Sequence, residues 1–235
     1  MLGLGNSIIS GAALGFSPAD ISNLALWLKN GTGVTAAQWD DSSGNDNHVT
    51  QGTSGNQASV VSGGLDFEED NQDHYDLTSK ITVSQNHNFI VGFVVTPENP
   101  TADRNCILGD DGNEFIDYQV DRVAINCGGT EITYVGDSAL FSDGTIAAVV
   151  ISRNDGSTGT FNVFINGVTP AGSYFGGTQT TNKAVEFNEL GVRSGTQRPL
   201  DGILHELVVY DLGTGTHTAA ELTALNNYFT SKFGI

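Results

Sequence analysis

Short apolar runs, many of them alternating with polar residues, recur along the whole chain and predict β-strands. Turn residues separate these runs at intervals typical of a two-sheet sandwich. Asn166 followed by Gly167 predicts a tight hairpin, because both residues tolerate the positive φ angles of a type I′ turn. The predicted strands are residues 24–29, 88–96, 105–109, 114–120, 122–127, 131–135, 145–152, 160–165, 185–191 and 203–210.

The pattern becomes helical after the last predicted strand. Thr218 and Glu221 have the spacing of a capping box, which opens a helix, and Gly234 suits the position just past a helix end. We expect the helix to pack on the sandwich through an apolar stripe, and the end strands 24–29 and 203–210 to pair with each other. The residues of the stripe are Leu222, Leu225, Phe229 and Phe233.

The chain is long enough for one large β domain. It has 235 residues, of which 30 are Gly and only 15% are charged, and this composition favours a fold with many turns. Ser17 followed by Pro18 predicts a helix start, and that helix has to be short because the strand pattern begins at residue 24. The sequence therefore predicts one all-β domain over residues 17–235, a two-sheet antiparallel sandwich with a C-terminal α-helix and a short N-terminal helix.

Residues 1–16 form an apolar, Gly-rich arm in front of this domain. The arm has neither helical nor strand periodicity, so it gains little by folding alone. It either packs along its own domain or binds a neighbouring subunit, and we favour the second, which implies a multimeric assembly. The residues expected to bind the partner are Leu2, Leu4, Ile8, Ile9, Leu14 and Phe16.

Charge and hydropathy exclude several classes of partner. The chain carries 9 basic and 27 acidic residues, a net charge of −18, so we expect neither nucleic acid nor an anionic membrane surface as a ligand. No apolar run reaches 18 residues, so no transmembrane helix is expected. Nor do we expect a signal peptide, because the N-terminus has no basic region and glycines interrupt its apolar residues.

Cys106 and Cys127 are expected to be free, buried thiols. They fall on predicted strands 105–109 and 122–127, with strand 114–120 between them. Neighbouring strands lie about 4.8 Å apart, so the two cysteines would be about 10 Å apart. That distance exceeds the limit of about 7 Å for a disulfide.

A series of short motifs gives the chain a family resemblance. In order, they are Leu26-Trp27-Leu28, then Trp39, Asp41, Ser43-Gly44-Asn45 and Asn47-His48, then Leu65-Asp66-Phe67 with Asp73-His74-Tyr75, then a hairpin ending in Asn166-Gly167, and last Gly202, Glu206 and Tyr210 before the helix. In this order they resemble the laminin-G-like modules of the concanavalin A-like superfamily. The resemblance covers residues 20–235 and implies that the sandwich is a two-sheet antiparallel jelly roll of the concanavalin A-like kind.

The resemblance also suggests a biological setting. Such modules are frequent in virion proteins of marine tailed phages, and the opening Met1-Leu2-Gly3-Leu4-Gly5-Asn6-Ser7 resembles the start of such proteins. We therefore expect a virion structural protein, a capsid decoration or a tail or fibre component, assembled in the host cytoplasm and bound to other virion proteins through its arm. The alternative is a carbohydrate-binding adhesin that recognises host surface glycans. The two hypotheses are compatible, because a displayed module can also bind glycans.

We expect no enzymatic activity. Members of the superfamily that hydrolyse polysaccharides place carboxylates at alternate strand positions, in a Glu-x-Asp-x-Glu pattern that faces one cleft. This sequence has no such run. It also has no nucleophile elbow, no phosphate-binding glycine loop and no pair of His residues at ligand spacing.

Two groups of residues are candidate ligand contacts. Asp41, Asn45 and Asn47 offer oxygen atoms in a Gly-containing loop and make calcium the one cofactor candidate, although none is required; alternatively, these side chains hold the loop's own backbone. Tyr174 and Phe175 lie in a predicted loop and are candidates for stacking on a sugar. Trp27 and Trp39 are expected in the core.

Overall fold

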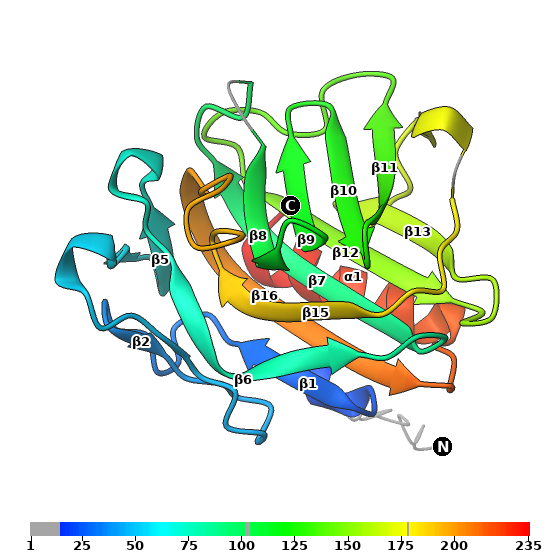
Figure 1. Ribbon diagram of the computed structural model, residues 1–235, viewed down its shortest axis with the longest axis horizontal. Coiled ribbons are helices and arrows are strands. Elements are labelled where there is room, and N and C mark those ends of the chain that lie inside the picture. The colour runs from blue at the N-terminus through cyan, green and yellow to red at the C-terminus, as the bar shows by residue number, and fades with distance from the viewer. Residues whose placement is uncertain (1–14, 102–103, 178) are drawn as a thin grey trace, which may run out of the picture.

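The computed structural model describes residues 15–101, 104–177 and 179–235. Two antiparallel β-sheets face each other and one α-helix lies outside them (Figure 1). This confirms the predicted sandwich with its closing helix. The described part of the chain contains no helix long and apolar enough to cross a membrane.

The first sheet has seven strands in the order β13-β12-β7-β16-β5-β4, and β1 also pairs with β16. The pairing of β1 with β16, predicted from the sequence, is confirmed, with Trp27 opposite Val208. The strands are β1 (Leu24–Leu28), β4 (Ser59–Val61), β5 (Gly64–Phe67), β7 (Asn88–Pro97), β12 (Ala147–Asn154), β13 (Thr160–Ile165) and β16 (Gly202–Gly213).

The second sheet has nine strands in the order β14-β11-β10-β9-β8-β15-β6-β3-β2. The last strand of this sheet along the chain, β15, lies between β8 and β6 and so joins segments that are far apart in sequence. The strands are β2 (Gln38–Trp39), β3 (Val49–Thr50), β6 (Tyr75–Val83), β8 (Asn105–Asp111), β9 (Glu114–Gln119), β10 (Arg122–Cys127), β11 (Thr130–Gly136), β14 (Gly172–Tyr174) and β15 (Val185–Leu190).

The main core lies between the two sheets. Alternate residues of the facing strands fill it, as the period of a strand requires, and Trp39 is fully buried there. Cys106 on β8 and Cys127 on β10 are free and buried, with β9 between the two strands. The prediction for both thiols is confirmed.

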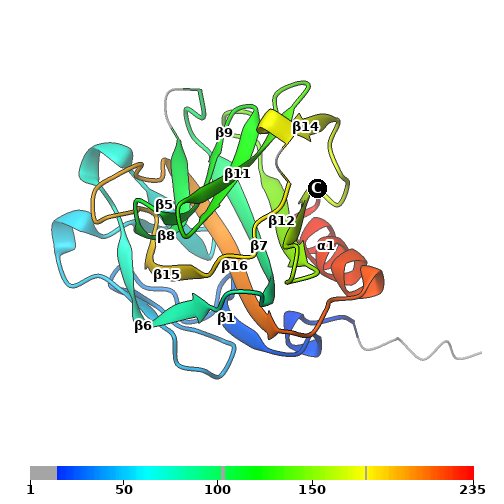
Figure 2. The same ribbon diagram turned by 45° about the vertical axis from the view of Figure 1, so that its right-hand side comes forward.

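The helix α1 (Ala219–Phe233) covers the outer face of the seven-stranded sheet (Figure 2). The predicted capping box is present. The Thr218 hydroxyl accepts from the Glu221 N–H, and the Glu221 carboxylate accepts from the Thr218 N–H. Gly234 ends the helix at φ 72°. Three stripe residues, Leu222, Leu225 and Phe229, are buried and form a second apolar cluster with residues of β7, β12 and β16.

Glu206 on β16 connects the helix to the first strand. Its carboxylate is fully buried and accepts bonds from Trp27 Nε1 and Tyr228 Oη, each 2.8 Å long, and from Lys232 Nζ. A buried carboxylate is tolerated when donors of this kind surround it. Glu206 therefore has a structural role in joining β1, β16 and α1.

Short 3-10 turns complete the fold: η1 (Pro18–Asp20), η2 (Ser54–Asn56), η3 (Glu69–Asn71) and η4 (Phe175–Gly177). The first confirms the predicted short N-terminal helix. Of the predicted arm, Leu2, Leu4, Ile8, Ile9 and Leu14 lie outside the described residues, and Phe16 is described. Phe16 packs edge-on against Tyr228 of the same chain, with 6.2 Å between the ring centroids.

Candidate functional site

The outer face of the nine-stranded sheet carries an unusual group of charged side chains. On β9, Ile116 and Tyr118 point into the core. The alternate residues Phe115 and Asp117 therefore lie on the outer face. Across the ladder, Asn126 of β10 is opposite Phe115.

Three arginines surround the ring of Phe115. The guanidinium carbon lies 6.0 Å from the ring centroid for Arg104, 4.5 Å for Arg193 and 4.8 Å for Arg198. Arg104 precedes β8, while the other two come from the loop between β15 and β16. We call these three residues, with Phe115, Asp117 and Glu131, the arginine cluster.

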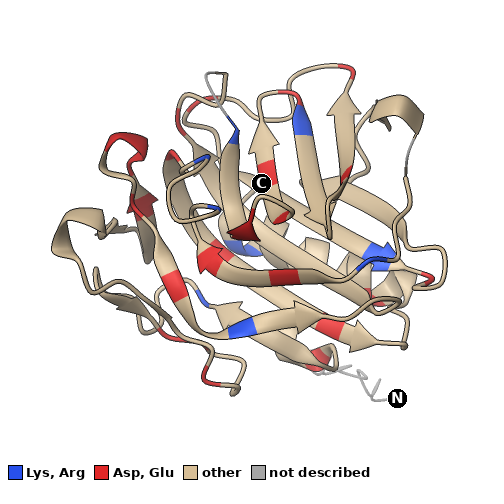
Figure 3. Ribbon diagram, viewed as in Figure 1, with Lys and Arg blue, Asp and Glu red and all other residues tan. Residues whose placement is uncertain are grey.

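Backbone contacts fix the loop that carries two of these arginines. Arg193 and Gln197 pair through bonds of 3.0 and 2.9 Å, and the Cys106 N–H donates to the Arg198 carbonyl at 3.0 Å. A Cβ on Gly109 would lie 2.6 Å from the Val192 carbonyl oxygen, so the loop rests directly on β8. Basic residues are visible both at the start of β8 and in this neighbouring loop (Figure 3).

Asp117 is fully buried beneath the arginines. Its Oδ2 accepts a bond from Arg198, and its Oδ1 lies 3.6 Å from Arg104 Nε without a hydrogen-bond partner among the described residues. Burial raises the pKa of Asp117 to about 6, against the opposing effect of Arg104 and Arg198. The carboxylate thus holds two guanidinium groups in place.

Glu131 on β11 fixes Arg104 from the other side. Both guanidinium nitrogens Nη1 and Nη2 of Arg104 donate to its carboxylate, a bidentate arrangement. Burial opposes the charge of Glu131, but the bonds from Arg104 outweigh it and lower the pKa of the carboxyl group. Glu131 also accepts from the Thr133 hydroxyl at 2.9 Å.

Arg193 differs from the other two arginines because it has no ion pair with a described residue. Its Nη1 donates to the Gly112 carbonyl at 3.3 Å, and its buried Nε has no hydrogen-bond partner in the described ranges. Burial and the neighbouring Arg198 lower the pKa of its guanidinium group. Such a group gains when an anion approaches.

The cluster retains a large capacity to donate hydrogen bonds. Each guanidinium group carries five N–H donors, yet the guanidinium groups of Arg193 and Arg198 each donate a single hydrogen bond to another described residue. The side chains of Arg104 and Arg198 are 17% and 24% exposed, so ligands can reach them. The cluster can therefore bind oxygen-rich groups from solution.

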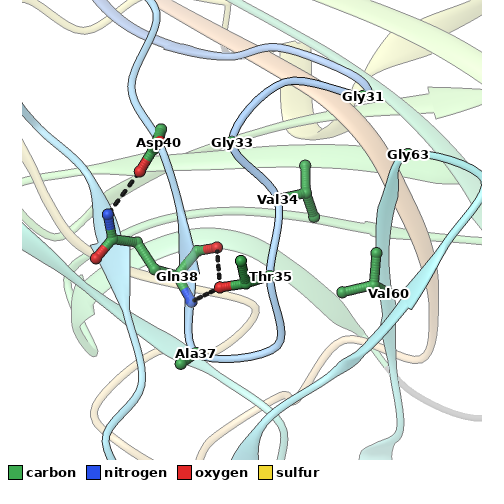
Figure 4. A pocket seen from close by; sticks show the side chains of 9 residues that line it. All are labelled: Gly31, Gly33, Val34, Thr35, Ala37, Gln38, Asp40, Val60 and Gly63. Atoms are coloured by element: carbon green, nitrogen blue, oxygen red, sulfur yellow. Dashed lines mark hydrogen bonds between the residues drawn. The ribbon is translucent and has the colours of Figure 1, made fainter.

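A hollow of about 660 Å³ offers a second candidate site. It lies between the loop of residues 31–40 and the β4–β5 hairpin, where Val34 and Val60 form its apolar side (Figure 4). Its polar side chains already bond to one another: Thr35 to the backbone of Gln38, and Gln38 to Asp40. We favour the arginine cluster because two of its buried polar atoms, Asp117 Oδ1 and Arg193 Nε, have no hydrogen-bond partner among the described residues.

The loop proposed for calcium uses its polar side chains internally. Both oxygens of Asp41 accept bonds, from the N–H groups of Trp27, Ser43 and Asn47 at 2.8–3.0 Å and from the Ser43 hydroxyl at 2.7 Å. The amide nitrogens of Asn45 and Asn47 donate to the Leu24 and Ala25 carbonyls. An ion at Asp41 would have to displace these donors, so the residues fit calcium poorly, and calcium binding stays a prediction.

In residues 15–101, 104–177 and 179–235, no three His, Cys, Asp or Glu side chains are arranged to hold a metal ion.

The two residues proposed for glycan stacking differ in exposure. Phe175 is 76% exposed, whereas Tyr174 is half-buried. Tyr174 donates to the Phe161 carbonyl at 2.8 Å and packs edge-on against Tyr134, and burial raises its pKa to about 12. Of the pair, Phe175 remains available to a ligand.

Sequence reasoning missed the arginine cluster. One signal was present: Asp117 stands between apolar residues in a predicted strand, and a buried carboxylate needs a cationic or hydrogen-bonding partner. The sequence alone does not identify the partner of Asp117, because Arg193 and Arg198 lie far along the chain from β9.

Comparison with known families gives one match. A model of the concanavalin A-like lectin/glucanases superfamily matches residues 69–221, a span that includes most of both sheets and the arginine cluster. A comparison with curated proteins finds no match.

Several solved structures share the fold. Domain 4 of AbnA, an extracellular arabinanase from Geobacillus stearothermophilus solved in complex with arabinotriose, is 20% identical over 87% of this chain and 98% of that domain, with a TM-score of 0.55. The binding domain of Paraclostridial Mosquitocidal Protein 1 is 14% identical over 90% of this chain and 53% of its own length, with a TM-score of 0.55. A Trypanosoma rangeli sialidase is 15% identical, with a TM-score of 0.57. The matched region covers 90% of this chain but only 33% of the sialidase chain, so this chain spans about a third of the sialidase's length.

Proposed function

Because the chain belongs to the concanavalin A-like lectin/glucanases superfamily, we propose that it is a non-catalytic module that binds carbohydrate on the outer face of its nine-stranded sheet. The observation that carries this proposal is the arginine cluster, where Arg193 and Arg198 keep most of their N–H donors unused by the described residues. Sugar hydroxyl groups and acidic substituents are good acceptors for such donors. The other sheet has less room for a ligand, because α1 covers part of its outer face.

Two proteins of similar fold support this proposal. The arabinanase domain was solved with a bound trisaccharide, and the mosquitocidal protein domain is described as a binding domain. In both cases the domain is a separate part of a larger protein. We propose that the domain described here likewise serves to bind a ligand.

The carboxylates of the cluster are poorly placed for hydrolysis. A glycosidase needs two carboxyl groups that reach the bond to be cleaved. Asp117 is fully buried, and the carboxylate of Glu131 is held by both terminal nitrogens of Arg104. We therefore propose binding rather than catalysis.

An array of neutral and acidic oligosaccharides, probed with the full chain, tests this function. We expect saturable binding to a defined subset of glycans. The same glycans, incubated with the protein, should release no more reducing ends than a heat-treated control. Absence of binding across the array would refute the proposal, and release of reducing ends would replace it with an enzymatic function.

Display on a phage particle is a second, compatible proposal. It rests on the resemblance of residues 1–7 to the start of phage virion proteins and assigns attachment to the arm. The packing of Phe16 on Tyr228 places the last residue of the arm beside α1. Deleting residues 1–14 should then leave a folded domain that binds glycan but no longer joins its particle; unchanged incorporation into particles would rule out the arm as the anchor.

A further inference from the structure

The arginine cluster is positively charged in a strongly acidic protein. Three of the chain's nine basic residues lie there, against the two carboxylates of Asp117 and Glu131. The chain as a whole has a net charge of −18. Gathering three guanidinium groups around one ring costs free energy through their mutual repulsion, so a purely structural role for all three needs a matching number of acids.

The acids present do not account for Arg193. Asp117 binds Arg198 and lies near Arg104, and Glu131 binds Arg104. Arg193 stacks on Phe115, and its guanidinium group donates to a backbone carbonyl, that of Gly112. Ion pairing with Asp117 and Glu131 therefore explains the positions of Arg104 and Arg198. It does not explain the position of Arg193.

We propose that the glycan bound on this face is acidic and carries an isolated carboxylate or sulfate group that Arg193 and Arg198 receive together. This inference rests on the proposed carbohydrate-binding function and specifies its ligand class. A guanidinium group presents its donors in a planar fork that matches such anions in a bidentate manner. Asp117 is a positioning residue, because it holds Arg198 and does not itself face the ligand.

The acidic group has to be isolated rather than part of a dense polyanion. The chain has 27 acidic residues against 9 basic ones, and the acidic residues are spread along both sheets and their loops (Figure 3). A polyanionic chain lying across the domain would therefore be repelled. At physiological ionic strength the Debye length is about 8 Å, so this repulsion reaches neighbouring charges of the ligand but is weak beyond the next sugar. A single acidic sugar or one sulfate on an otherwise neutral glycan supplies the anion for the arginines and brings no further negative charge near the acidic residues.

Matched glycans test the ligand class with the full chain. The array carries lactose, sialyllactose and sulfolactose, together with oligogalacturonides and their neutral methyl esters. We expect binding to a singly charged member, sialyllactose or sulfolactose, and at least about tenfold weaker binding to lactose, as expected for the loss of a charge-assisted contact. The oligogalacturonides carry a carboxylate on every sugar and should bind more weakly than the singly charged glycan. Comparison of sialyllactose with sulfolactose tells carboxylate from sulfate.

Two variants with the same change in net charge locate the acidic group. Arg193→Gln removes the unpaired guanidinium without leaving a carboxylate unpaired, and we expect it to weaken binding of the acidic hit by about tenfold or more with an unchanged melting temperature. Arg122→Gln, at the far end of β10 where Arg122 bonds to Asp121, is the control and should bind like the wild type. If Arg193→Gln fails to fold, Arg193→Lys keeps the charge, and its loss of the planar fork should still weaken binding.

The possible outcomes separate the two proposals. Equal binding of neutral and acidic partners would overturn the acidic ligand class while leaving carbohydrate binding intact. Acidic glycans that bind Arg193→Gln and the wild type equally would remove the arginine cluster from the binding site. If no glycan binds at all, both proposals fall.

Discussion

Phe229 of α1 and Gly92 of β7 form a contact that can test how the closing helix is docked. Phe229 is fully buried. A Cβ added to Gly92 would lie 2.7 Å from Phe229 Cε2 and 3.2 Å from Val208 Cγ2. The absence of a side chain at Gly92 therefore makes room for the ring, and substitutions at the two positions should depend on each other.

The size of each effect follows from this packing. Phe229→Ala removes a fully buried ring and should cost about 3–5 kcal/mol, as buried Phe truncations do. Gly92→Ala forces a methyl group against the ring and should cost about 1–3 kcal/mol. For a domain of this length, about 2–4 °C of melting temperature corresponds to each kcal/mol.

The double variant Gly92→Ala/Phe229→Ala is the decisive member of this cycle. In the double variant the added methyl group would occupy part of the space left by the ring. Its loss of unfolding free energy should therefore be smaller than the sum of the two single losses, by about 1 kcal/mol or more. Urea unfolding followed by the fluorescence of the buried Trp27 and Trp39 measures all four free energies. Strictly additive costs would refute the docking of Phe229 over Gly92.

Two further predictions concern the cap and the charges of the fold. Thr218→Ala removes one capping bond of α1 and should cost only about 1 kcal/mol in urea unfolding; a loss larger than that of Phe229→Ala would mean that the cap rather than the apolar stripe holds the helix. Burial, and then Asp66 and other nearby carboxylates, raise the pKa of Glu98 above its usual range. Since a raised pKa contributes stability at acid pH that is lost as pH rises through it, Glu98→Gln should melt at a higher temperature than the wild type at pH 7 but not near pH 4. Asp137→Asn, which removes an exposed carboxylate, is the control; an equal gain from both variants, or a gain that persists near pH 4, would contradict this explanation.

The sequence predicted the central elements well because their signals are local. The strand predicted at 122–127 coincides with β10, and the one at 160–165 with β13. The Asn166-Gly167 turn has the expected positive φ angles of 50° and 80°. Burial patterns and turn residues act over a few positions, so single segments suffice to read them.

The short edge strands and the extended β16 were harder to predict. β2 and β3 have two residues each, too few for a period to be visible. β16 continues to Gly213, beyond the predicted end at residue 210, because its turn-like residues still pair with β7 up to Asn88. In both places the partner strand, rather than local preference, decides the structure.

The candidate site could not be assembled from the sequence for a related reason. Arg104, Asp117 and Arg198 come from three separate segments, and they meet because β15 inserts beside β8 and brings the following loop over β9. The loop of Asp41, Asn45 and Asn47 was recognisable as polar, but only the structure shows that its side chains bond to their own backbone.

Hydrogen–deuterium exchange of the full chain, with and without a saturating concentration of a glycan identified on the array, tests the central claim most directly. Binding on the outer face of the nine-stranded sheet predicts slower exchange in β9, in β10 and in the loop of residues 191–200. Protection confined to the hollow at residues 31–40, with β9 and that loop unchanged, would contradict the account.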